Sequence, residues 1–144
     1  MATTGTISVL KADGSVASIY SHWDNYPSWN GKLLLQHYNT QELAEKLVSL
    51  GNISSLGERI EPTPDALHSF ETPERGTTVY YGRDRGEDDQ EPNIYWGLNM
   101  FRSSGRHEQY NYMFKDGQWY LMNGRNGWTL VSEVLAIDEA EDHV

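Results

Sequence analysis

Residues 15–51 read SVASIYSHWDNYPSWNGKLLLQHYNTQELAEKLVSLG, and the fold expected for this chain is organised around them. The first six residues continue an alternation of polar and apolar side chains, which predicts a strand over 15–20. The polar and aromatic segment 21–27 ends that strand, because Pro27 lacks an amide donor. No other stretch combines such clear structural boundaries with so many chemically capable side chains.

Two short amphipathic helices are expected after this turn. Three consecutive leucines and Tyr38 predict the first helix over 33–38. Asn39 is expected to cap the second helix, which places Glu42 at the third helical position, as in a capping box. Gly51 is expected to end that helix in the left-handed conformation. The apolar stripe of the second helix is formed by Leu43, Leu47 and Leu50.

Two Asp-Gly pairs each separate a pair of strand-like runs. Asp-Gly readily takes the positive φ angles that tight turns need, so a β-hairpin is predicted at each pair. The two hairpins are expected over 6–20 and 109–121, around Asp13-Gly14 and Asp116-Gly117. Asn-Gly pairs at 123–124 and 126–127 predict another turn.

The remaining segments give weaker patterns. Strands are predicted over 77–81 and 128–131, and Val134 and Leu135 either extend the second of these or begin a helix. Prolines interrupt residues 52–76, where one short edge strand is expected near Arg59-Ile60. Residues 82–92 are expected to form an exposed loop, and residues 94–101 a helix.

These elements together predict an α+β fold. Hairpin strands are expected to form an antiparallel sheet, and the short helical pair is expected to pack on one face of it. At 144 residues the chain fits one domain over 1–137, followed by an acidic, disordered tail over 138–144.

Composition narrows the classes of function. The net charge is −10 and there is no cysteine, which argues against disulfides and thiolate metal sites. Nucleic acids and anionic membranes are negatively charged and bind clusters of Lys and Arg. We therefore expect neither as a partner of this acidic chain. No signal peptide or long apolar run is visible, and a cytoplasmic protein is expected.

One candidate for chemistry is the set His22, Asp24 and His37. His22 and Asp24 are two positions apart and face one side of an extended chain, while His37 follows at the end of the first predicted helix. Such a set is able to hold a divalent metal or to catalyse proton transfer. The alternative is a structural role, in which Asp24 caps the loop and His22 forms a hydrogen bond within it. Because the spacing matches no metal motif, we expect no metal and no cofactor.

The second candidate is a set of aromatic and arginine side chains. Arginine beside an aromatic ring is able to hold a nucleobase or a phosphate, and the same residue types dominate protein interfaces. The sequence does not separate these two uses. The residues predicted to bind a ligand or partner are Trp23, Tyr26, Trp29, Tyr81, Arg83 and Arg85.

Catalytic and phosphate-binding motifs are missing from the sequence. The acidic residues of 84–91 do not follow the calcium-loop spacing, and Ser54-Ser55 lacks the G-x-S-x-G environment of a serine nucleophile. No G-x-x-x-x-G-K or G-x-G-x-x-G pattern occurs.

Several segments resemble a family of small proteins encoded by bacteriophages and prophages. The likeness is carried by ADGSV at 12–16, IYSHWDNYP at 19–27, LLLQHY at 33–38 and YGRDRGE at 81–87. It implies a viral origin and host cytoplasm as the location, and it implies no particular reaction.

The expected function is therefore binding. The first hypothesis is a non-enzymatic phage accessory protein that binds a host protein or a defence component. The alternative is a protein that sequesters a small nucleotide-like ligand, with a homodimer interface as one place for its pocket. The third hypothesis is a hydrolase that uses His22 and Asp24.

Overall fold

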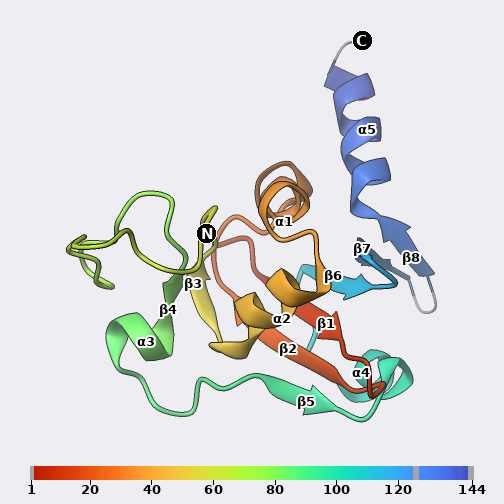
Figure 1. The fold of residues 1–144 in the computed structure, drawn as a ribbon. Coiled ribbons are helices and arrows are strands. Elements are labelled where there is room, and N and C mark those ends of the chain that lie inside the picture. Colours follow the sequence, from red (N-terminus) through yellow and green to blue (C-terminus); the bar gives the residue numbers. More distant parts are fainter. Residues whose placement is uncertain (1, 125–126, 143–144) are drawn as a thin grey trace.

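The computed structural model describes residues 2–124 and 127–142, which form an eight-stranded sheet with short helices around it (Figure 1). The strands are β1 (Gly5–Leu10), β2 (Val16–Ser21), β3 (Ile53–Ser55), β4 (Val79–Tyr80), β5 (Asn93–Tyr95), β6 (Tyr110–Lys115), β7 (Gln118–Asn123) and β8 (Gly127–Leu130). The helices are the π-helical turn η1 (Pro27–Gly31), α1 (Lys32–His37), α2 (Gln41–Ser49), α3 (Tyr81–Arg85), α4 (Leu98–Ser104) and α5 (Val131–Asp142).

The sheet has the order β4-β3-β2-β1-β6-β7-β8, and β5 also pairs with β2. Both predicted hairpins are present, as β1–β2 and β6–β7. They are joined side by side by parallel pairing of β1 with β6, in which Ile7 lies opposite Tyr112. The predicted α+β class is confirmed, although β1–β6 and β2–β3 are parallel pairs in a mostly antiparallel sheet.

Local turn chemistry explains why both hairpins were predictable. Gly14 has φ +89°, and the Asp13 carboxylate accepts hydrogen bonds from the amide and hydroxyl of Ser15. In the second hairpin Asp116 and Gly117 both have positive φ, as tight turns require. These conformations depend on neighbouring residues only.

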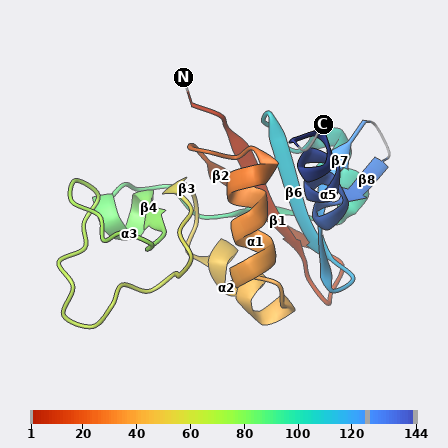
Figure 2. The same ribbon diagram turned by 90° about the horizontal axis from the view of Figure 1, so that it is seen from above.

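Both faces of the sheet are covered. The larger core lies between the sheet and α1, α2 and α5, and Figure 2 shows these helices on one side of the strands. A smaller core on the opposite face is built from Val16, Phe101 and Met113. The helical pair α1–α2 was predicted, whereas the second covered face was not.

The cap of α2 differs from the prediction by one residue. Thr40, not Asn39, is the N-cap, and its hydroxyl accepts a hydrogen bond from the Leu43 amide at 3.2 Å. Glu42 is therefore the second helical residue. Gly51 ends the helix region with φ +95°, as predicted.

Three middle segments differ from their predictions. The edge strand expected near Arg59-Ile60 is wrong: Arg59 forms only one isolated bridge with Thr77, and the strand of this segment is β3, which lies between β2 and β4. The predicted strand over 77–81 shortens to β4, and the predicted loop begins as helix α3, which Gly86 ends at φ +75°. The predicted helix over 94–101 is partly wrong, because β5 pairs with β2 before α4 begins.

After β8 the chain continues as α5 and not as a longer strand. The turn predicted at 123–127 includes residues 125–126, which lie outside the described residues, as do 143–144. The single domain and its acidic tail stay predictions. Within the described residues, none of the helices has the length and apolar character needed to cross a membrane.

A buried amide network holds η1 in its unusual conformation. The Asn25 side chain donates to the carbonyls of Thr3, Ser21 and Trp23, at 2.9 to 3.2 Å. Asn30 donates to the Trp23 carbonyl and to Asn25 Oδ1, at 2.9 and 3.0 Å. The network fixes the polar turn that the sequence placed after β2.

We expect Asn30→Ala to lower the free energy of unfolding by about 1–3 kcal/mol, because buried acceptors lose their donor. Chemical denaturation measures this change. Asn39→Ala is the matched control, since Asn39 is exposed, and it should stay within about 0.5 kcal/mol of wild type. Equal stabilities of the two variants would contradict a stabilising role for the network.

Candidate functional site

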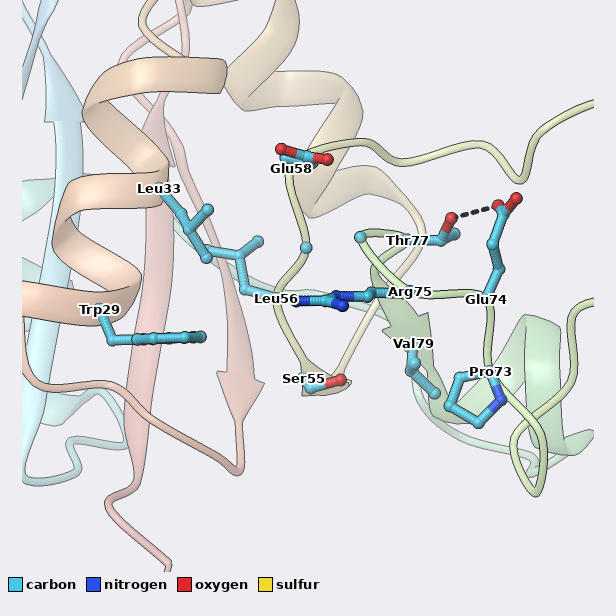
Figure 3. A pocket seen from close by; sticks show the side chains of 12 residues that line it. Trp29, Leu33, Ser55, Leu56, Glu58, Pro73, Glu74, Arg75, Thr77 and Val79 are labelled. Atoms are coloured by element: carbon cyan, nitrogen blue, oxygen red, sulfur yellow. Dashed lines mark hydrogen bonds between the residues drawn. The ribbon is translucent and has the colours of Figure 1, made fainter.

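A cleft of about 470 Å³ lies between the helical wall of η1 and α1 and a second wall formed by the segments around β3 and β4 (Figure 3). We call it the Arg75 cleft. It is lined by Trp29, Leu33, Ser55, Leu56, Gly57, Glu58, Pro73, Glu74, Arg75, Gly76, Thr77 and Val79.

The helical wall presents Trp29 and Leu33 to the cleft. Trp29 belongs to η1, and its amide donates to the Tyr26 carbonyl at 3.0 Å. The Trp29 side chain is 53% exposed although the asparagine network beneath it is buried. Trp29 and Leu33 also line a smaller hollow of about 190 Å³, so they form a ridge between two concave surfaces.

The opposite wall depends on a very close approach of two backbone segments. The Arg59 amide donates to the Gly76 carbonyl at 3.1 Å, and the Thr78 amide donates to the Arg59 carbonyl at 2.9 Å. A Cβ atom at Gly57 would lie 2.5 Å from the Gly76 carbonyl oxygen, so only glycine fits there. Tyr38 fixes this wall to the core, because its hydroxyl donates to the Gly57 carbonyl at 2.6 Å.

Arg75 is carried by a tight turn on this second wall. The Thr77 amide donates to the Glu74 carbonyl at 3.1 Å, and Gly76 has φ +87°, as the third position of a type II turn requires. The Arg75 carbonyl accepts a hydrogen bond from Arg59 Nη2 at 2.6 Å. The Arg75 side chain extends into the cleft beside Leu56 (Figure 3).

The two carboxylates of the cleft contact Arg59 and not Arg75. Arg59 Nη1 lies 3.6 Å from Glu58 Oε1, and Arg59 Nη2 lies 3.5 Å from Glu74 Oε1. Within the part of the chain that the structure describes, the Arg75 guanidinium has no hydrogen-bond, ion-pair or ring partner. The other described arginines, which do have partners, are Arg59, Arg83, Arg85, Arg102 and Arg106.

Glu74 is held as an anion by hydrogen bonds from Thr63 and from Thr77 of the turn. The Thr63 amide and the Thr77 hydroxyl donate to Glu74 Oε1 at 2.9 and 2.6 Å. The hydrogen bonds to Thr63 and Thr77 lower the Glu74 pKa to about 2. A carboxyl with so low a pKa is ionised at neutral pH, so it is unsuited to act as a general acid.

Behind the second wall, Asp84 forms a buried polar network. Its carboxylate accepts from Arg83 Nε and from the Tyr80 amide, both at 2.8 Å, and lies 3.1 Å from His68 Nε2. His68 Nδ1 accepts from the Glu74 amide at 3.0 Å. Burial raises the pKa of Asp84, but the hydrogen bonds from Arg83 and Tyr80 outweigh burial and leave that pKa below its ordinary value. The network ties α3 to the Arg75 turn.

The predicted binding residues Arg83, Arg85 and Tyr81 lie on α3, outside the residues that line the cleft. Arg83 also donates to the carbonyls of Ile60 and Thr78, at 2.8 and 2.9 Å, so its donors have internal acceptors. The Arg85 guanidinium lies 4.6 Å from the centre of the Phe70 ring, which also contacts Tyr81. Binding by these three residues stays a prediction.

The predicted set His22, Asp24 and His37 is divided between different partners. His22 Nδ1 lies 2.6 Å from the Tyr20 hydroxyl, and the His22 ring packs edge to face on Trp23. Asp24 has φ +60°, and its carbonyl accepts from the Asn30 amide. His37 Nε2 lies 3.9 Å from Glu58 Oε2. Among the described residues, no group of three acidic or histidine side chains is placed to hold a metal ion.

Of the predicted binding residues, only Trp29 lines the cleft. The Tyr26 carbonyl accepts a hydrogen bond from the Trp29 amide. Sequence analysis missed Arg75, Glu58 and Glu74. A signal was present, because Pro73 and Gly76 bracket a turn, but a turn motif does not reveal which wall its side chains face.

Comparison of the chain with protein-family models, with curated proteins and with solved structures found no match. The resemblance to phage proteins stays a prediction, and the site is interpreted from its own geometry.

We expect Asp84→Ala to lower the free energy of unfolding by about 2–3 kcal/mol, because it removes charge-assisted hydrogen bonds from Arg83 and the Tyr80 amide. Chemical denaturation measures the change. The exposed residue Asp88 offers a control, and Asp88→Ala should change stability by less than about 0.5 kcal/mol. A similarly small change for Asp84→Ala would show that the network contributes little.

The Glu74 pKa gives a pH-dependent prediction. A carboxyl whose pKa falls from 4.5 to about 2 on folding stabilises the fold above pH 4.5 and loses that contribution as pH falls towards 2. The melting temperature of wild type should therefore fall more steeply over this range than that of Glu74→Gln, as circular dichroism would measure. Glu71→Gln, at an exposed position, should follow wild type. If the melting temperatures of wild type and Glu74→Gln fall in parallel with pH, the lowered pKa of Glu74 is contradicted.

Proposed function

We propose that this protein binds a partner protein through the Arg75 cleft, and that it acts as a non-enzymatic accessory protein. The observation that carries the proposal is the pairing of a half-exposed Trp29 with an unpartnered Arg75 on opposite walls of one cleft. Tryptophan and arginine are the residue types most enriched where binding energy concentrates in protein interfaces. A host protein or a defence component is the kind of partner that the resemblance to phage proteins suggests.

The chemistry of the cleft supports binding more than catalysis. Glu74 is committed to Thr63, Thr77 and Arg59, and Glu58 is shared between Arg59 and His37. The apolar side chains of Leu33 and Pro73 supply surface that a partner side chain is able to cover, beside the buried Leu56 and Val79. Such a mixture of apolar walls and one free charge is typical of recognition sites.

A nucleotide-like ligand is the second candidate. Its support is the volume of the cleft, about 470 Å³, which falls in the range of roughly 300–1,000 Å³ seen for small-molecule sites. An aromatic ring and a guanidinium are also the groups that hold a base and a phosphate. A thermal-shift screen with nucleotides separates the candidates, because a ligand at about 100 times its Kd stabilises the fold by about 2.7 kcal/mol.

Capture from bacterial lysate tests the leading proposal. Wild type should retain a stoichiometric partner, and Trp29→Ala should lose most of it, because truncating an interface tryptophan typically costs about 2 kcal/mol or more. Trp96→Ala is the matched control, since Trp96 is 87% exposed and does not line the cleft. If Trp29→Ala retains as much partner as Trp96→Ala and wild type, the binding surface lies elsewhere. Repeated failure of wild type to capture a partner would count against the proposal itself.

A further inference from the structure

We infer that the Arg75 cleft recognises a carboxylate carried by an apolar peptide segment of the partner, with Arg75 as the residue that pairs with the carboxylate. The inference rests on the proposed function and names the chemistry of its ligand. Three observations carry it: the freedom of the Arg75 charge, the rigidity of its turn and the apolar surface around it.

Among residues 2–124 and 127–142, the Arg75 guanidinium has no partner, although two carboxylates line the same cleft. Arg59 contacts both of them, at 3.6 Å for Glu58 and 3.5 Å for Glu74. The Glu74 carboxylate is further occupied by Thr63 and Thr77. The internal anions are therefore directed away from Arg75, and a planar anion from outside is the natural partner for its fork of N–H donors.

The Arg75 backbone is ordered before any ligand arrives. The turn is closed by the Thr77 amide on the Glu74 carbonyl at 3.1 Å, and the Arg75 carbonyl is held by Arg59 Nη2 at 2.6 Å. Glu74 joins the turn to the His68–Asp84 network through its amide. A ligand that binds here has less conformational entropy to remove than at a mobile loop.

The surroundings favour a carboxylate over a phosphate. A phosphate monoester carries nearly two negative charges at neutral pH. It would lie in a cleft that already holds Glu58 and Glu74, on a chain with a net charge of −10. A carboxylate carries one negative charge, and apolar residues next to it are able to contact Trp29, Leu33 and Pro73. The match is therefore to an apolar segment with a single acidic group.

Short peptides test the inference by NMR, with the Trp29 indole N–H and the Arg75 Nε–H as reporters. Four N-acetylated probes suffice: Leu-Phe-Leu with a free carboxylate, its carboxamide, amidated Leu-Glu-Leu, and amidated Leu-phosphoserine-Leu. At least one carboxylate probe should shift both signals and bind at least tenfold more tightly than the neutral carboxamide. The tighter of the two carboxylate probes identifies a chain terminus or an acidic side chain as the source.

Variants then assign the carboxylate contact. Arg75→Gln should weaken the carboxylate probe about tenfold to a hundredfold, as expected for a lost charge-assisted hydrogen bond. Arg75→Lys, which keeps the charge and loses the planar fork, should weaken it less. Arg106→Gln removes the same charge from an exposed position that does not line the cleft, and it should bind as wild type does.

Several results would overturn the inference. Equal binding of the carboxamide and carboxylate probes, or an unchanged affinity of Arg75→Gln, would leave the cleft as an apolar binding surface without carboxylate recognition. Tightest binding of the phosphoserine probe would assign a phosphate instead. If no probe shifts the Trp29 and Arg75 signals at millimolar concentration, carboxylate recognition fails, while the capture experiment with Trp29→Ala still decides the proposed function separately.

Discussion

The Arg59 guanidinium connects both carboxylates of the cleft to the turn that carries Arg75. It lies within ion-pair distance of Glu58 and Glu74, donates to the Arg75 carbonyl, and donates from Nε to the Thr77 hydroxyl at 3.0 Å. Arg59 thereby neutralises the internal acids and orders the turn, and this leaves Arg75 without a partner among the residues that the structure describes. The charge of the candidate site depends on this division of partners between two arginines.

The two walls of the cleft are stabilised by different means. The helical wall depends on buried amide hydrogen bonds between Asn25, Asn30 and the chain ends of β1 and β2. The second wall depends on the close backbone approach at Gly57 and Gly76 and on the buried Asp84 network. Apolar packing beneath them comes from the larger core, where Tyr38 contributes to both the core and the Gly57 contact.

Elements were predictable from the sequence where the interactions that form them join residues close together in the chain. The Asp13-Gly14 and Asp116-Gly117 hairpins and the leucine stripe of α2 depend on residues within a few positions of one another, and all three were predicted. Helix α3 was not, and its side chains also contact segments distant in sequence: Arg83 donates to the Ile60 carbonyl, and Asp84 lies beside His68. The pattern over 94–101 predicts a helix, but residues 93–95 form β5, whose pairing partner β2 is distant in sequence.

The sequence by itself determined the α+β class, the hairpin turns and the presence of Trp29 in a polar turn after β2. Tertiary structure decided which of the described arginines has no partner among the described residues. Arg83 and Arg85 stand among aromatic residues in sequence, yet in the fold Arg83 donates to the Ile60 carbonyl and Arg85 lies over the Phe70 ring. Arg75 stands among prolines and acids, yet within the described part of the chain its charge has no ion-pair partner, because Arg59 contacts both Glu58 and Glu74. Partners of long, charged side chains come from segments that only the folded chain brings together.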